Sequence, residues 1–212
     1  MILFSHGFGV QKDDRGLFTD IAPHLSDEYR MFDYNSWDEQ ARKLRVTPID
    51  VQVELLLGEL SKLEEPVDLI CHSQGCVIAA LAQPQNIRSV IFLAPAATRT
   101  ADELATLFSK NGASVYNRTG TSVLQRSDGS QTLVPPEYWD SLDNVGDTYT
   151  LYQRFSQITN LTIITAVEEE IVAQVDYSGI KNVTLGSITG ADHNFTGDSR
   201  QKVVEAVASL LN

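Results

Sequence analysis

The chain of 212 residues is 42% hydrophobic and 21% charged, which is enough for one α/β domain with a packed core and excludes a disordered segment. Its 16 Lys and Arg residues against 28 Asp and Glu residues give a net charge of −12, which disfavours nucleic acid, an anionic membrane surface and highly anionic substrates as partners. The sequence has no apolar run long enough to span a membrane and no charged leader of the kind that a secretory signal needs, so we expect neither.

Short apolar strands alternate with amphipathic helices in the first part of the chain. The sequence predicts strands at residues 1–5, 29–34, 67–71 and 88–93, and helices at 17–25, 48–63 and 74–83. The second of these helices has the clearest start, because Thr47 is a favourable N-cap, Pro48 suits the first helical position and Asp50 complements the helix dipole. Alternation of this kind predicts a mostly parallel sheet with helices on both faces.

The alternation stops between residues 98 and 146, where Ser, Thr, Asn and Gly are frequent. Segments 123–126 and 131–134 flank a Ser-Asp-Gly-Ser sequence, which predicts a hairpin. An insertion of this length is usually a functional loop, so we expect residues 98–146 to form a lid within a single domain of residues 1–212. The regular pattern then resumes, with a helix predicted at 148–158, strands at 161–166 and 183–187, and a last helix starting near residue 198.

The two cysteines lie close to each other in the sequence, Cys71 at the end of a predicted strand and Cys76 inside the helix that follows. This placement is poor geometry for a disulfide. We therefore expect both thiols to be reduced and buried, as is usual in a cytoplasmic protein.

Residues 67–78 predict a strand, a sharp turn and a helix, with Ser73 at the apex of the turn. A serine at this point lies beside the N–H groups of a helix N-terminus, which is the position of a nucleophile. The pattern Gly-x-Ser-x-Gly requires small residues two before and two after the serine. Gly75 meets this requirement fully and Cys71 less well. The alternative interpretation is a serine in an ordinary strand–helix turn.

A serine hydroxyl is a weak nucleophile that needs a base, an acid that orients the base, and donors for the developing oxyanion. His193 is the candidate base because it lies in a polar loop after the last predicted strand, although a solvated loop histidine is the alternative. We expect His6 to brace its loop through backbone hydrogen bonds. We expect His72 to point away from Ser73, and His24 to be exposed.

Several carboxylates compete for the role of the acid. Glu168, Glu169 and Glu170 follow the fifth predicted strand, although a solvated helix start would also account for such a run. Asp192 is a further candidate, but it is adjacent to His193, and adjacent side chains rarely face each other. The residues alone therefore leave the acid open.

The oxyanion donors are expected to be backbone N–H groups, so the identity of their side chains matters little. Gln74, directly after the candidate nucleophile, supplies one, and the loop after the first strand supplies the other at Phe8 or Gly7. This chemistry needs no metal and no organic cofactor.

Together these motifs resemble those of the α/β-hydrolase-fold serine hydrolases. The sequence is most similar to the small bacterial acyl esterases of the cinnamoyl and feruloyl esterase group and to their serine-aminopeptidase-like relatives. The matching stretches are residues 6–9 (HGFG), 71–75 (CHSQG), 92–97 (FLAPAA) and 190–195 (GADHNF). They occur in the order of the family and are specific for the superfamily, but not for a substrate.

The resemblance implies a minimal α/β-hydrolase fold with about six strands and an inserted lid. It implies Ser73 as nucleophile, His193 as base, and Phe8 and Gln74 as oxyanion donors. The acid of the family lies in a Gly-x-x-Asp stretch after the fifth strand. Here that stretch reads Ala-Val-Glu-Glu, so Glu169 takes the place of the acid.

The sequence thus predicts a cytoplasmic serine hydrolase that cleaves small-molecule carboxylic esters through an acyl-enzyme. In the insertion, Tyr116, Tyr138 and Trp139 are candidates for the substrate pocket, with packing inside the lid as the alternative. The same catalytic groups would also serve for cleavage of an amide, a thioester or a carbon–carbon bond. A binding protein that kept the fold without the activity is a third interpretation.

Overall fold

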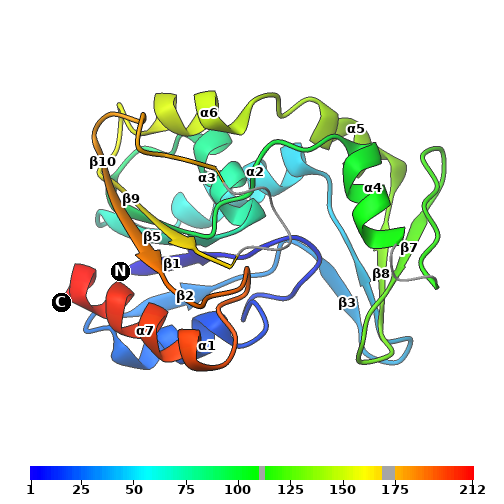
Figure 1. The fold of residues 1–212 in the computed structure, drawn as a ribbon, viewed down its shortest axis with the longest axis horizontal. Helices are drawn as coiled ribbons and strands as arrows, with labels where there is room; N and C mark the ends of the chain where they lie inside the picture. The colour runs from blue at the N-terminus through cyan, green and yellow to red at the C-terminus, as the bar shows by residue number, and fades with distance from the viewer. Residues whose placement is uncertain (110–112, 169–174) are drawn as a thin grey trace.

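The computed structural model describes residues 1–109, 113–168 and 175–212. Its main sheet has six parallel strands in the order β10-β9-β6-β5-β1-β2 (Figure 1). The strands are β1 (Ile2–Ser5), β2 (Tyr29–Met31), β5 (Val67–His72), β6 (Ile87–Leu93), β9 (Leu161–Ala166) and β10 (Val183–Ile188). The mostly parallel sheet predicted from the sequence is therefore confirmed.

Helices cover both faces of this sheet, as the alternating pattern predicts (Figure 1). On one face lie α2 (Ile49–Leu60), α3 (Gln74–Ala82) and α6 (Thr148–Phe155), and on the other α1 (Leu17–Ile21), the short 3-10 helix η1 (Ala22–His24) and α7 (Asp198–Leu211). The strand β5 is buried along its whole length, and a separate apolar core fills the space under each layer. Among the helices of the described ranges, none has the length and apolarity needed to cross a membrane.

The start of α2 differs by one position from its sequence signals. Pro48 occupies the N-cap position that the sequence assigns to Thr47. The Thr47 hydroxyl instead donates to the carbonyl oxygen of Tyr34, with an O–O distance of 2.6 Å. Thr47 therefore ties the start of α2 to the chain that follows β2.

A second sheet joins the insertion to an earlier part of the chain. Its order is β3-β4-β8-β7, and β7 (Ser122–Gln125) and β8 (Gln131–Val134) form the antiparallel hairpin that the sequence predicts. The strands β3 (Ser36–Asp38) and β4 (Lys43–Arg45) form in a stretch for which the sequence predicts no helix or strand, and β4 pairs in parallel with β8. The insertion is thus attached to the main domain by a strand ladder.

The insertion also has an apolar core of its own, which the sequence does not reveal. Two helices of this region, α4 (Ala101–Ser109) and α5 (Pro136–Asp143), pack beside the second sheet (Figure 1). Leu44 of β4, Val134 of β8 and Trp139 of α5 are among its buried side chains. The core is hard to predict because its residues come from segments far apart in the chain.

The start of α3 passes very close to the end of β1. A Cβ atom built on Gly75 would lie 2.1 Å from the carbonyl oxygen of Ser5, far closer than two non-bonded atoms approach. The obstructing atom belongs to the backbone and cannot rotate aside. The glycine of the turn motif is therefore required by the approach of strand and helix.

Gly75→Ala is expected to lower the free energy of unfolding in urea by about 2 kcal/mol or more, because β1 or α3 must shift to admit the methyl group. Gly58→Ala in α2 is the matched control. No atom lies within 4 Å of its Cβ position, so alanine should stabilise this exposed helix site by about 0.5–1 kcal/mol. Similar small effects at the two sites would contradict the close approach at Gly75.

Candidate active site

Ser73 lies at the apex of the turn between β5 and α3, with φ 52° and ψ −119°. This conformation is unfavourable for a residue with a side chain, and it persists only where the surroundings impose it. The Ser73 N–H donates to the carbonyl oxygen of Leu93 (3.0 Å), and the Ser73 carbonyl oxygen accepts from the N–H of Ala96 (3.2 Å). The end of β6 therefore holds the strained serine on both sides.

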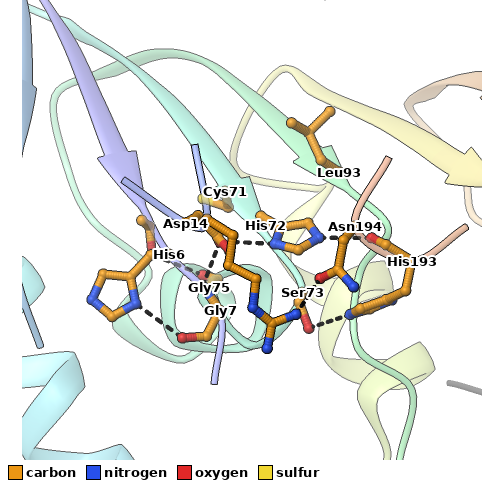
Figure 2. A network of polar contacts seen from close by, with 12 residues as sticks. His6, Gly7, Asp14, Cys71, His72, Ser73, Gly75, Leu93, His193 and Asn194 are labelled. Carbon is orange, nitrogen blue, oxygen red and sulfur yellow. Dashed lines mark hydrogen bonds and ion pairs between the residues drawn. The ribbon is translucent and has the colours of Figure 1, made fainter. Parts of the chain in front are cut away.

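His193 follows β10 and its side chain reaches Ser73 (Figure 2). Its Nε2 atom lies 2.8 Å from Ser73 Oγ, within hydrogen-bond distance, and both residues are buried. The adjacent Asp192 stabilises the loop, because its carboxylate accepts from the N–H (2.8 Å) and the hydroxyl (2.6 Å) of Thr196. A base at this distance can take the proton of the serine hydroxyl as the oxygen attacks.

The structure describes two of the four candidate acids, Glu168 and Asp192. Glu169, which the family resemblance favours, and Glu170 lie outside the described residues, so the acid stays a prediction. Glu168 is exposed, and its N–H donates to the carbonyl oxygen of Ala191 (2.8 Å). The carboxylate of Asp192 is engaged by Thr196.

Gly7 and Phe8, the two candidate oxyanion donors in the loop after β1, differ in whether their N–H group is already bonded. The N–H of Gly7 already donates to Asp14 Oδ2 (2.8 Å), which leaves Phe8 as the better candidate of the two. The ring of Phe8 stacks on Phe108 of α4, with centroids 5.5 Å apart. Gln74, the other predicted donor, is the first residue of α3, and its buried side chain accepts a hydrogen bond from the Tyr138 hydroxyl.

A buried ion pair, which the sequence does not reveal, lies directly behind the serine. His72 Nδ1 is 2.8 Å from Asp14 Oδ2, and His72 Nε2 is 2.9 Å from the backbone oxygen of His193 (Figure 2). Both groups opposite the ring are acceptors, so both ring nitrogens must donate, and the imidazole is positively charged. Asp14 thus connects three loops: its own, the Ser73 turn through His72, and the His193 loop through the same ring.

The pKa directions agree with this charged pair. Burial alone would lower the pKa of His72, but the charge and hydrogen bond of Asp14 raise it above its ordinary value. Burial would raise the pKa of Asp14, but the charge and hydrogen bond of His72 hold it below its ordinary value. Both shifts favour the charged forms, in agreement with the geometry of the pair.

The other histidines lie where the sequence predicts. His6 Nδ1 is 2.9 Å from the carbonyl oxygen of Gly7, and its Nε2 accepts from the N–H of Tyr34 (3.0 Å). One acceptor and one donor face this ring, so it is neutral, and burial lowers its pKa. His24 is exposed.

A cavity of about 160 Å³ opens beside Ser73 and His193. Tyr138, one of the predicted pocket residues, lines it, together with apolar side chains of the insertion and of the main domain. The other two predicted residues do not line it. The Trp139 indole N–H donates to Ser122 Oγ (3.0 Å), and its ring packs edge-to-face on Tyr116, with centroids 5.3 Å apart. Both side chains pack instead in the apolar core beside the second sheet.

A family model described as "Serine hydrolase" matches residues 32–125, a segment that contains Ser73. No curated protein matches the sequence.

Solved structures match the chain over nearly all of its length at low identity. A monoacylglycerol lipase from Paleococcus ferrophilus has a TM-score of 0.66 and 13% identity, and the match covers 99% of this chain and 93% of that chain. Est1E from Butyrivibrio proteoclasticus has a TM-score of 0.64 and 17% identity, with 99% and 85% covered. A thermophilic esterase from Thermogutta terrifontis has a TM-score of 0.66 and 14% identity, with 99% and 88% covered. At these identities the likeness shows a shared fold.

Asp14→Asn is expected to lower the free energy of unfolding by about 3 kcal/mol near pH 5.5, because it removes one partner of a buried ion pair. The carboxylate contributes stability above its ordinary pKa of 3.8 and loses it as the pH falls. The imidazolium contributes below its ordinary pKa of 6.5 and loses that contribution as the pH rises through its raised folded-state pKa. Urea unfolding should therefore show a larger effect near pH 5.5 than near pH 9.

The matched control is Asp13→Asn. The Asp13 carboxylate accepts from the N–H of Gly16 (3.1 Å), a bond that asparagine can replace. Its effect on the free energy of unfolding should be small, because asparagine keeps this bond. A cost for Asp14→Asn that stays the same from pH 5.5 to pH 9, within about 0.5 kcal/mol, would contradict the charged pair.

Proposed function

We propose that this chain, which has the α/β-hydrolase fold, is a serine hydrolase that cleaves small carboxylic esters with Ser73 as the nucleophile and His193 as the base. The observation that supports this most directly is the 2.8 Å contact between Ser73 Oγ and His193 Nε2, made at a strained turn between strand and helix. A structural serine needs neither the strain nor a buried histidine beside it.

In the proposed reaction, Ser73 Oγ attacks the acyl carbon while its proton passes to His193 Nε2. The N–H groups of Phe8 and Gln74 hold the oxyanion of the tetrahedral intermediate. His193 then gives the proton to the alcohol oxygen as the C–O bond breaks, which leaves the acyl group on Ser73. Water, deprotonated by His193, attacks the acyl-enzyme, and collapse of the second intermediate releases the acid and restores the serine.

The size and lining of the cavity support a small substrate. A volume of about 160 Å³ is below the range of about 300–1,000 Å³ that is typical of sites for drug-sized ligands. The names of the similar structures include esterases and a monoacylglycerol lipase, which favours ester cleavage over amide or carbon–carbon cleavage. We therefore propose short acyl groups as the preferred substrates.

We also propose that residues 98–146 act as the lid of this site. Phe108 of α4, and Tyr138 and Leu142 of α5, line the cavity. The hydroxyl of Tyr138 contacts Gln74, next to the nucleophile. The insertion thus contributes to the walls of the pocket and contacts the residue that supplies an oxyanion donor.

Ser73→Ala is expected to lower kcat/KM for p-nitrophenyl butyrate at least about a thousandfold, with retained stability to urea. His193→Ala should have a loss of similar size, and the double variant should be no worse than either single one, because the two groups act as a unit. Turnover by Ser73→Ala equal to that of the wild type would contradict the proposal. An inactive wild type that also fails to react at Ser73 with a serine-directed phosphonate would favour the binding-protein interpretation.

Glu169→Gln is expected to lower kcat by about a thousandfold or more, because the amide cannot stabilise the imidazolium that forms on His193. Glu168→Gln is the matched control, since the side chain of Glu168 is exposed, and it should change kcat less than about twofold. A large loss in Glu170→Gln or Asp192→Asn with none in Glu169→Gln would move the role of the acid to that residue.

A further inference from the structure

Three arginines line the cavity that contains Ser73 and His193. Arg15 comes from the loop after β1, Arg99 from the segment before α4, and Arg126 from the residue after β7. Among the described residues that line this cavity, Asp14 is the one carboxylate, and its charge is balanced by His72. The described lining of the cavity therefore carries a net positive charge, although the whole chain carries a charge of −12.

Arg126 is held in place by neutral groups. Its Nε donates to Thr132 Oγ1 (2.8 Å) and one terminal nitrogen donates to the carbonyl oxygen of Gly9 (3.2 Å). Asp128, two residues away, forms its ion pair with Arg42 instead (3.6 Å). These bonds fix the orientation of the guanidinium, and within the described part of the chain no carboxylate forms an ion pair with it.

The positive charges of Arg15 and Arg126 also repel each other. A terminal nitrogen of Arg15 donates to the side-chain oxygen of Asn194 (2.9 Å), which is again a neutral partner. Burial and the nearby charge of Arg15 lower the pKa of Arg126 to about 10, so it stays charged at neutral pH. Two like charges held close together are unfavourable until an anion binds between them or beside them.

Arg99, the third arginine of the cavity, has an unsatisfied hydrogen-bond donor. Its Nε is buried and has no hydrogen-bond partner among the described residues. Burial of a donor without an acceptor costs free energy, and a ligand atom that accepts a hydrogen bond from this donor would offset that cost. The carboxylate of nearby Glu103 accepts from the N–H of Thr100 (2.7 Å) and is directed to the start of α4.

We propose that the ester cleaved at Ser73 also carries a carboxylate, which Arg126 and Arg15 bind inside the cavity. The inference rests on the proposed ester hydrolysis and specifies its substrate class. Guanidinium groups bind carboxylates through paired, charge-assisted hydrogen bonds, and their fixed orientation favours this geometry. The small volume of the cavity places the carboxylate only a few bonds from the scissile ester, as in a monoester of a short dicarboxylic acid.

The test compares two substrates that differ in one charge: the p-nitrophenyl monoester of glutaric acid and the same ester of its monoamide. Spontaneous hydrolysis is subtracted with an enzyme-free blank. The wild type should show a kcat/KM about tenfold or more higher for the carboxylate ester, which corresponds to one charged hydrogen bond. The advantage should shrink as ionic strength rises.

Arg126→Gln should remove this preference, because kcat/KM should fall at least about tenfold more for the carboxylate ester than for the neutral monoamide ester. The matched control is Arg45→Gln on β4, whose exposed arginine does not line the cavity. It should keep the preference. If Arg126→Gln does not fold, Arg15→Gln is measured in the same way. A wild-type enzyme that favours the monoamide ester, or an unchanged preference in the cavity variant, would overturn the inference while ester hydrolysis stands.

The neutral monoamide ester tests the proposed function separately. If the wild type cleaves this ester and Ser73→Ala does not, ester hydrolysis at Ser73 is supported. If neither ester is cleaved, that function fails, and calorimetry with glutarate then tests the carboxylate site by itself. Binding that is at least about tenfold weaker in Arg126→Gln than in Arg45→Gln would support the site. No binding of glutarate by the wild type would overturn it.

Discussion

The buried ion pair between Asp14 and His72 is the interaction on which the geometry of the site depends. Asp14 accepts from the N–H of Gly7 and from the ring of His72, and the same ring donates to the backbone of His193. The loop after β1, the Ser73 turn and the His193 loop are thus bonded to one another behind the contact between Ser73 and His193. A shift of any one of them would strain a charged, solvent-excluded contact, which is costly.

The main sheet and the meeting of Ser73 with His193 at its edge could be predicted from the sequence because both depend on local patterns. The strands β1, β5 and β6 are short apolar runs, and Ser73 and His193 each follow a predicted strand at the sheet edge where ligands bind. Asp14 could not be predicted. It lies in a polar stretch beside the similar Asp13, and only the fold places one of the two carboxylates behind the serine.

The second sheet could not be predicted for a related reason. Each of the strands β3 and β4 has three residues, and β4 buries one of them, Leu44, so neither run is long enough to show an alternating pattern. Their stability comes from pairing with the hairpin of the insertion.

The positive charge of the cavity lining could not be predicted either, because it also depends on residues far apart in the sequence. The whole-chain charge of −12 disfavours anionic ligands, but Arg15, Arg99 and Arg126 come together only through tertiary structure.

The parallel ladder between β4 and β8 has a consequence for how this fold can be recombined. The insertion is continuous in sequence, and it would seem to be a module that could be exchanged between related enzymes by cutting at its two ends. The ladder makes the exchangeable unit discontinuous. A chimera that received a foreign segment at residues 98–146 would leave the pair of strands β3 and β4 without its partner strand β8 and would expose Leu44. Residues 36–45 would have to be transplanted along with it.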